Sequence, residues 1–196
     1  TGWFYDQRDN RARLDRYVAG RRVLDVFGYV GSWGIRAAAR GAQEVLCVDS
    51  SGSALEQATA NAALNGVGER VRTQQGDAFE ILKGLREARE RFDMVIVDPP
   101  AFVKRRKDFK EGALAYRRLN EMAMQVLERD GILVSCSCSQ LLSRDVLIQT
   151  LLQGSRHLDR NLVILEQGRQ GPDHPVPPAI PETDYLKMVI ARVLPA

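Results

Sequence analysis

The stretch FDMVIVDPPAF, residues 92–102, decides the fold of this chain. Its first six residues form a nearly continuous apolar run, which is typical of a strand buried on both faces. Two prolines then end the strand, because proline lacks the N–H group that a strand ladder needs. Asp98 is therefore predicted at the carboxyl end of a buried strand, where open α/β sheets bind their ligands. Phe102 adds an aromatic face, so this edge is predicted to hold a flat base.

Outward from this strand, apolar runs alternate with stretches of helical periodicity. Strands are predicted at 22–27, 44–49, 71–74, 92–98 and 132–138, and helices at 32–40, 52–65, 78–90, 111–129 and 143–156. This alternation predicts parallel β-α-β units. Two further strands, 162–166 and 185–193, have no helix between them and predict an antiparallel hairpin at one sheet edge. The fold class is thus a single α/β domain, 1–196, with a mostly parallel, doubly wound, seven-stranded sheet.

Composition sets the class of protein. The 196 residues are 44% hydrophobic and 27% charged, which is ordinary for a water-soluble domain. The three cysteines are an odd number without a framework spacing, which favours reduced thiols and a cytoplasmic location. No apolar stretch approaches the ~20 residues of a membrane span, and no signal sequence is visible, so no membrane association is expected. The chain begins at Thr1 inside a dense aromatic segment, and we expect further residues upstream.

The segment DVFGYVG, residues 25–31, points to a nucleotide-like cofactor. Phe27 leads into two glycines, Gly28 and Gly31, which let the backbone approach a ligand closely. Asp25 at the strand end suits a cation or an ammonium group. Asp49, followed by Ser50, ends the next strand, and an acid there accepts two hydrogen bonds from a ribose diol. Phe27 and Ser50 are assigned to the cofactor site together with these acids and glycines.

The glycine spacing separates two candidate cofactors. Dinucleotide sites use G-x-G-x-x-G, whereas this chain has G-x-x-G-x-x-G over residues 28–34. Asp25 before the glycines repels a pyrophosphate but suits the α-ammonium of a methionine moiety. S-adenosylmethionine is therefore favoured. Asp77 and Ala78 follow the third strand and suit an adenine, with the carboxylate accepting from its amino group; an N-cap role for Asp77 is equally open.

The ordered set of motifs resembles a known family. They are DVFGYVG (25–31), VDS (48–50), GDAF (76–79), DPPAF (98–102) and SCS (137–139). This set resembles the class I Rossmann-like methyltransferases, and more closely the bacterial 23S rRNA cytosine-C5 methyltransferases that carry an N-terminal PUA domain. The segments GWFYDQRD (2–9), DHPV (173–176) and YLK (185–187) are also similar to that family. The resemblance implies S-adenosylmethionine as cofactor, 23S rRNA as partner and an RNA-binding domain upstream of this chain.

The chemistry that the resemblance implies requires a cysteine. Carbon 5 of cytosine is a poor nucleophile, so a thiolate must first add to carbon 6. Cys138 ends the fifth strand, beside the strand that carries Asp98, and is assigned as nucleophile. Asp98 is expected to hydrogen-bond N3 and N4 of the ring. Cys136 lies two residues earlier on the same strand face and is expected to be a packing residue. Better-known RNA cytosine-C5 enzymes place a second cysteine where this chain has Pro100.

Two other functions stay open. In one, the enzyme methylates a ring nitrogen or an exocyclic amine, the Asp98-Pro99-Pro100 turn positions the base, and Cys138 is passive. In the other, the chain is a non-catalytic nucleic-acid-binding factor that retains the cofactor fold. Formation of a covalent adduct with RNA distinguishes methylation at carbon 5 of cytosine from both of these alternatives.

Basic residues follow the Asp-Pro-Pro motif closely. Residues 104–118 carry seven Lys or Arg against two acids, which favours a polyanion. Lys104 and Arg105, together with Pro99, Pro100 and Phe102, are predicted to bind the RNA substrate. The alternative is an ordinary solvated loop and helix start.

The N-terminal segment carries a few further predictions. Gln7 and Arg8 lie in the family-like stretch and are assigned to the cofactor. Arg13 and Arg16 are expected on the exposed face of a first helix, and Phe4 and Tyr5 are expected to pack under the sheet. Cys136 and Cys138 have no zinc spacing with His157 or His174, so no metal is expected. A homodimer is left open.

Overall fold

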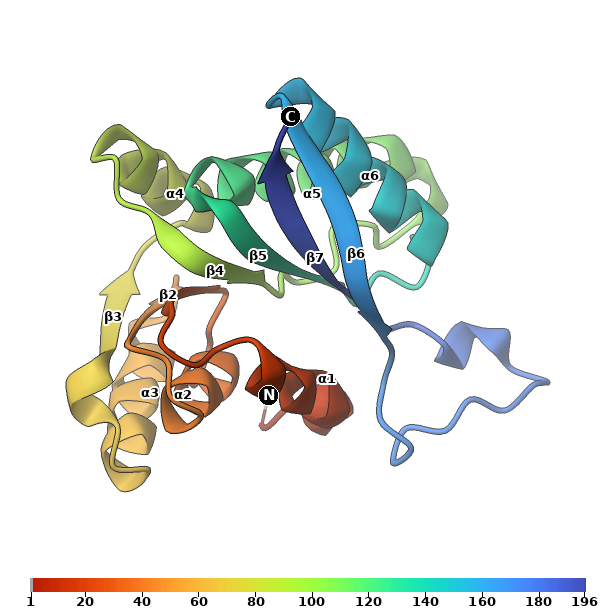
Figure 1. The fold of residues 1–196 in the computed structure, drawn as a ribbon. Coiled ribbons are helices and arrows are strands. Elements are labelled where there is room, and N and C mark those ends of the chain that lie inside the picture. Colours follow the sequence, from red (N-terminus) through yellow and green to blue (C-terminus); the bar gives the residue numbers. More distant parts are fainter. Residues whose placement is uncertain (1) are drawn as a thin grey trace.

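A twisted sheet with the strand order β3-β2-β1-β4-β5-β7-β6 forms the centre of the computed structural model, which describes residues 2–196 (Figure 1). The strands are β1 Arg22–Val26, β2 Glu44–Asp49, β3 Val71–Gln75, β4 Phe92–Val97, β5 Leu127–Ser137, β6 Arg160–Gly168 and β7 Lys187–Pro195. The α-helices are α1 Arg8–Arg13, α2 Ser32–Ala39, α3 Gly52–Leu64, α4 Ala78–Glu87, α5 Phe109–Gln125 and α6 Arg144–His157.

The strand pairing confirms the α/β class. Strands β1 to β5 pair in parallel, whereas β7 lies antiparallel between β5 and β6. The C-terminal hairpin is therefore present at the sheet edge. The strand order reverses between β1 and β4, and α/β sheets bind ligands outside the carboxyl ends of the strands at this switch point.

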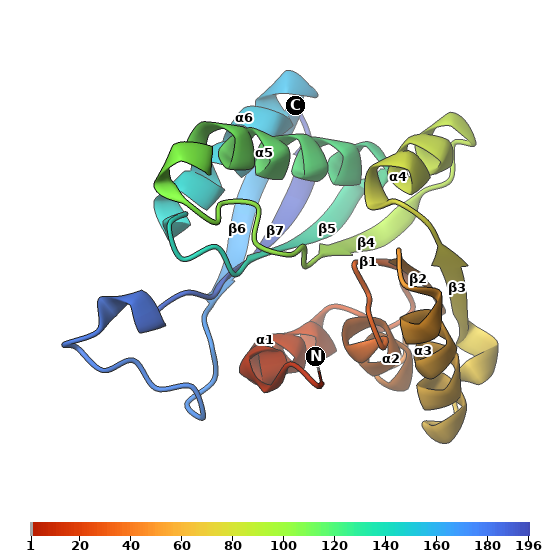
Figure 2. The same cartoon turned by 180° about the vertical axis from the view of Figure 1, so that it is seen from behind.

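Helices cover both faces of the sheet. Figures 1 and 2 show α1, α2 and α3 on one face and α4, α5 and α6 on the other. Strand β4 supplies both cores: Met94 and Ile96 pack toward the first layer, Val95 and Val97 toward the second. Burial on both faces explains why its sequence is apolar without alternation.

The boundary between α5 and β5 differs from the sequence prediction. The expected helix 111–129 and a turn at Asp130-Gly131 are wrong at that end, because α5 ends at Gln125 and β5 begins at Leu127. Leu127 pairs with Phe92, and a register shift between Phe92 and Met94 accommodates the extra strand residues. Buried tertiary pairing thus overrides the helical periodicity of this segment.

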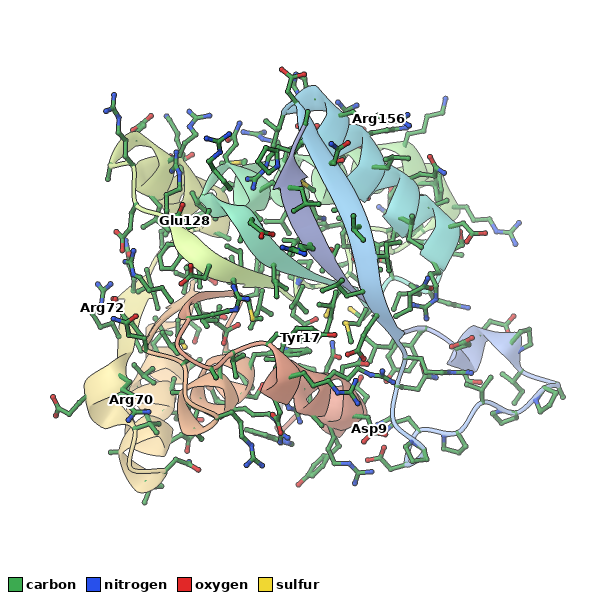
Figure 3. The ribbon with its side chains drawn as sticks, in the orientation of Figure 1. Asp9, Tyr17, Arg70, Arg72, Glu128 and Arg156 are labelled. Carbon is green, nitrogen blue, oxygen red and sulfur yellow. The ribbon has the colours of Figure 1, made fainter. Side chains whose placement is uncertain are left out.

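The N-terminal segment is fixed to the far edge of the sheet. Arg13, Arg16 and the Tyr17 hydroxyl all donate to the Glu166 carboxylate of β6, at 2.7, 2.8 and 2.7 Å (Tyr17 is labelled in Figure 3). Arg13 and Arg16 therefore have a structural partner as well as solvent contact. Phe4 and Tyr5 do not pack under the sheet as expected, since they are 47% and 61% exposed.

Candidate functional site

The carboxyl ends of β1, β4 and β5 bring the main candidate residues together. Val26 pairs with Val97, and Val97 pairs with Ser135, so Asp98 lies between the ends of β1 and β5. The Cys138 thiol lies 3.9 Å from the carbonyl oxygen of Pro99. The structure thus places the predicted nucleophile against the Asp-Pro-Pro turn.

Asp98 has three side-chain contacts in this arrangement. Gln7 Nε2 lies 3.1 Å from both carboxylate oxygens, and Trp33 Nε1 donates to Oδ2 at 2.9 Å. Gln7 Oε1 in turn accepts from Asn10 Nδ2 at 2.8 Å, which fixes the orientation of the amide. Gln7, assigned to the cofactor from the sequence, is therefore buried against Asp98.

Trp33 was missed by the sequence analysis. It follows the glycine loop in the first turn of α2 and is 2% exposed. A buried indole N–H requires an acceptor, and this requirement is the one sequence signal for a polar partner near Trp33.

Burial raises the pKa of Asp98 from 3.8 to about 6. The hydrogen bonds from Trp33 and Gln7 favour the ionised form, while the charge of Asp6 disfavours it. A carboxyl group with such a pKa can both donate and accept a proton near neutral pH.

Asp25 is the second acid at this edge and has no exposed surface. Its Oδ2 accepts from the Gly34 N–H at 2.9 Å and contacts the Cys47 thiol at 3.8 Å, whereas Oδ1 has no partner. Burial raises its pKa to about 7, with a further increase from the charge of Asp98. A buried acceptor without a partner costs free energy, so the free oxygen fits an incoming cationic donor.

The loop after β1 has a strained backbone. Phe27 and Tyr29 have φ angles of 64° and 51°, in the left-handed region that such residues rarely adopt. A Cβ on Gly28 would lie 3.2 Å from Asp25 Oδ2, and Gly31 has φ 83°. The loop is held in this shape in part by Asp49, which accepts from the Tyr29 N–H at 2.9 Å. Strain of this kind is found where backbone must approach a ligand.

The acids after β2 and β3 have different roles. Asp49 is partly exposed and accepts from the Ser51 N–H at 2.9 Å as well as from Tyr29, and its remaining lone pairs suit ribose hydroxyls. Ser50 beside it is exposed. Asp77 caps α4, because its Oδ1 accepts from Phe79 and Glu80 at 2.9 and 3.1 Å. Its N-cap role is thus confirmed. Ala78 is buried behind it.

These features together fit S-adenosylmethionine. Asp25 has an oxygen without a partner, which suits an ammonium group, and Asp49 offers acceptors for the ribose. A Cβ at Gly28 or Gly31 would meet the Asp25 or Ile35 side chain, so these glycines allow close packing of the loop. Arg8 lines a depression of about 630 Å³ with Gly31, and its guanidinium lies 3.3 Å from the Asp9 carboxylate and 4.0 Å from that of Asp173.

The Asp-Pro-Pro turn is tied to the end of β5. Ser139 Oγ accepts from the Val103 N–H at 3.1 Å and lies 2.9 Å from the Tyr116 hydroxyl. The Phe102 ring packs on Tyr116 with ring centroids 4.8 Å apart and is half-buried. Pro99 is buried and Pro100 exposed. The turn and the Cys138 segment therefore form one rigid unit.

The predicted RNA-binding cations lie on the following loop. Lys104 is exposed, whereas Arg105 pairs with Asp108 at 2.7 Å. Arg106, Lys107 and Lys110 line a depression of about 650 Å³ with Phe109 and Leu141. Within residues 2–196, these three cations have no carboxylate within 4.0 Å.

The three cysteines differ in access. Cys47 and Cys136 are completely buried in the apolar core, and burial raises the pKa of both thiols. Cys138 is half-buried. Burial also raises the pKa of Cys138, the charge of Asp98 raises it further, and the charge of Lys187 opposes both. Only Cys138, of these three, is placed to meet a ligand at the sheet edge.

No helix within 2–196 is long and apolar enough to cross a membrane. The same residues contain no group of three or more His, Cys, Asp or Glu side chains placed to hold a metal ion.

Comparison with known families agrees with the cofactor geometry. The model of a family described as S-adenosylmethionine-dependent methyltransferase matches residues 1–185. The chain belongs to this family. As the family description implies, the cofactor of this methyltransferase is S-adenosylmethionine.

Curated relatives of the methyltransferase carry a more specific name. Two proteins called ribosomal RNA large subunit methyltransferase I, from Erwinia tasmaniensis and Tolumonas auensis, are 38% and 39% identical to it over 195 residues. The match covers 99% of this chain and 49% of each relative, so the chain spans about half their length.

Solved structures share the fold. SMU.776, in complex with SAH, superposes with a TM-score of 0.87 at 23% identity. The match covers 98% of this chain and 50% of the SMU.776 chain. M. jannaschii TYW2, in complex with AdoMet, gives a TM-score of 0.70 at 15% identity and covers 100% and 79%. At these identities the likeness concerns the fold alone.

Proposed function

We propose that this methyltransferase transfers a methyl group to carbon 5 of a cytosine in 23S ribosomal RNA, with Cys138 as covalent nucleophile. The observation that carries the proposal is the accessible Cys138 thiol beside the Asp98 turn, at the edge where the cofactor residues converge. The names of the curated relatives support a large-subunit ribosomal RNA as substrate, which also favours action in the cytoplasm.

The reaction begins with the Cys138 thiolate. Its sulfur forms a bond to carbon 6 of the cytosine, and the electron pair of the ring moves through carbon 5 and carbon 4 onto N3. Asp98 in its protonated form donates its proton to N3 and so stabilises the enamine. Its pKa of about 6 makes this proton available and also lets the carboxylate recover it later.

Methyl transfer and release complete the cycle. When bound, the cofactor supplies an electrophilic methyl group on a sulfonium, which carbon 5 attacks. A base then takes the proton from carbon 5, the bond between carbons 5 and 6 becomes double again, and the Cys138 thiolate leaves. The N3 proton returns to Asp98, so both side chains regain their starting states.

The cofactor residues would hold and orient the methyl donor. Asp25 would accept from the ammonium group and Asp49 from the ribose hydroxyls, and Arg8 would bind the carboxylate in exchange for its partners Asp9 and Asp173. The strained 27–31 loop supplies close backbone contact. Asp77 Oδ1 is occupied by the α4 cap, so its proposed contact with the adenine amino group uses Oδ2.

The RNA strand is proposed to reach the site across the loop after the Asp-Pro-Pro turn. Lys104, Arg106, Lys107 and Lys110 are exposed cations beside the half-buried Phe109 ring. Arg105 contributes less than the sequence suggested, because it pairs with Asp108. Phosphate contacts of this kind weaken as salt concentration rises.

One observation favours a second candidate function. The raised pKa of the Cys138 thiol means that the resting enzyme holds little thiolate at neutral pH. Methylation of a ring nitrogen or an amine needs no thiolate, and the Asp98-Pro99-Pro100 turn would then position the base alone.

Tritium release tests the proposed function. Large-subunit ribosomal RNA containing [5-³H]cytidine is incubated with the protein and the methyl donor, and released tritium is compared with methyl groups transferred. Methylation at carbon 5 must release one tritium for each methyl group at the target position. Methyl transfer without tritium release would overturn the proposal and support nitrogen methylation.

A further inference from the structure

A buried lysine without a carboxylate partner lies beside the proposed nucleophile. Lys187, the first residue of β7, is 5% exposed. Its Nζ donates to the carbonyl oxygens of Ser139 at 2.6 Å and Tyr185 at 2.8 Å. Among residues 2–196, no carboxylate lies within 4.0 Å of this ammonium group. Burial of an unpaired ammonium is costly, so a functional reason is expected.

The sheet register places this charge at the Cys138 segment. Lys187 pairs with Ser137 across β5 and β7, and its Nζ reaches the carbonyl of Ser139. The two residues that flank Cys138 in the chain are thus both held by Lys187. Ser139 also anchors the loop that follows the Asp-Pro-Pro turn, through the Val103 N–H.

Charges on several elements face the Cys138 thiol. Asp98 after β4 and Asp6 in the N-terminal segment disfavour the thiolate, whereas Lys187 favours it. Tyr116 of α5 and Tyr185 also lie within range of the thiol, as neutral phenols near pH 7. Lys187 is therefore the charge that offsets the two acids.

The lysine itself senses several groups. Burial lowers the pKa of Lys187 to about 8, Cys138 as thiolate raises it, Arg144 of α6 lowers it and Asp184 raises it. The ammonium form still predominates at pH 7. Because the thiol and the lysine affect each other, they titrate as a pair.

We propose that Lys187 is a positioning residue that holds the Cys138 thiolate ready for attack by placing a fixed ammonium charge at its segment. When the thiol ionises, its proton leaves to solvent and Lys187 stays protonated. The electron pair left on sulfur then forms the bond to carbon 6. This inference rests on the proposed function for its role in catalysis, but the charge coupling itself exists without RNA or cofactor.

Alkylation of Cys138 tests the coupling. The rate of reaction with iodoacetamide is measured at pH 7, where Lys187 is mainly in its ammonium form, by mass spectrometry of the peptide that contains Cys138. Lys187→Gln removes the charge and keeps a hydrogen-bond donor, Lys187→Arg keeps both, and Asp98→Asn removes a charge of opposite sign. Cys47 and Cys136 are completely buried, so their lack of reaction shows in each sample that the protein is folded.

The three variants have distinct expected results. Lys187→Gln lowers the alkylation rate of Cys138 at pH 7 about tenfold, because the thiolate loses its counter-charge and its population falls. Lys187→Arg leaves the rate near that of the wild type, and Asp98→Asn raises it. A folded Lys187→Gln variant with the wild-type rate would overturn the proposal.

A second measurement does not depend on the lysine variants. The ¹³Cε resonance of Lys187 is titrated in the wild type and in Cys138→Asp, whose carboxylate is ionised while the lysine titrates. Reciprocity requires that a negative charge at position 138 raises the pKa of Lys187. Equal pKa values in both proteins would also overturn the proposal. Since neither measurement uses RNA, a failure to methylate carbon 5 leaves the coupling result intact, and the two proposals fail separately.

Discussion

Acidic side chains at the two ends of the sheet differ in their partners. At the amino ends of the strands, Glu44 of β2 pairs with Arg22 of β1 at 3.3 Å and with Arg72 of β3, which is labelled in Figure 3. The hydrogen bond from Arg72 is the main reason why the pKa of Glu44 is lowered. This acid is stabilised in its ionised form.

At the carboxyl ends the acids lack such partners. Within residues 2–196, no Lys, Arg or His lies within 4.0 Å of Asp25 or Asp98 in an ion pair, and burial raises their pKa values to about 7 and 6. At the amino ends of the strands, where acids serve stability, this fold pairs them with basic side chains. At the carboxyl ends, where α/β sheets bind ligands, Asp25 and Asp98 have no such partners, which costs stability.

Replacement of Asp98, at the carboxyl ends of the strands, is expected to have the largest effect on methyl transfer. Asp98→Asn cannot donate a proton to N3, so methyl transfer is expected to fall by roughly 10²- to 10⁴-fold. Stability moves the other way. The folded-state pKa is raised from 3.8 to about 6, so the stability contributed by the protonated acid is full below 3.8 and lost as the pH rises through 6.

Urea unfolding at pH 5 and pH 8 checks that sign. The wild type should lose stability relative to Asp98→Asn between these values, while methyl transfer is assayed on the same samples. A variant that is both active and less stable at pH 8 would refute the assignment of Asp98.

Asp25→Asn tests the second buried acid, which lies at the cofactor loop. Because the folded-state pKa of Asp25 is raised to about 7, the ionised form is disfavoured in the native state at higher pH. The variant should gain roughly 1–3 kcal/mol over the wild type at pH 8 and little at pH 4. Its affinity for the methyl donor should fall, as measured by calorimetry. Unchanged affinity would remove Asp25 from the cofactor site.

Asp49 lies at the same end but is more exposed and occupied by backbone N–H groups. Asp49→Ala should weaken binding of the methyl donor by roughly 1–3 kcal/mol, because charge-assisted hydrogen bonds to the ribose are lost. Calorimetry with Glu44→Gln, at the opposite end of β2, as control measures this change. Equal affinities for both variants would place the ribose elsewhere.

Glu44→Gln probes the opposite end and has the smallest expected effect. Its lowered pKa means that the ion pairs contribute stability above 4.5, which is lost as the pH falls through the folded-state pKa. The variant should lose about 0.5–1 kcal/mol at pH 7 and keep its methyl transfer rate. A large loss of activity would show that the two ends are not functionally separate.

The sequence predicted what depends on local pattern. Apolar runs indicate the strands, and the parallel topology that they predict brings the Asp98 turn and Cys138 to one edge. The partners of Asp98 were not predictable in this way, since Gln7 is 91 residues away and Trp33 is 65 residues away. Lys187 was visible only as part of a family-like motif, because its burial depends on β7 pairing with β5. The predicted boundary between α5 and β5 is wrong for the same reason, since the pairing of β5 with β4 decides where the helix ends.

Covalent trapping of RNA tests directly whether Cys138 is the nucleophile. RNA that contains 5-fluorocytidine is incubated with the methyl donor and the wild-type, Cys138→Ala or Cys136→Ala protein, then run on a denaturing gel. Fluorine at carbon 5 cannot leave as a proton does, so a thiolate adduct persists. A shifted band is expected for the wild type and for Cys136→Ala, and none for Cys138→Ala. Intact methyl transfer to ordinary RNA with no adduct in any of the three proteins would contradict it.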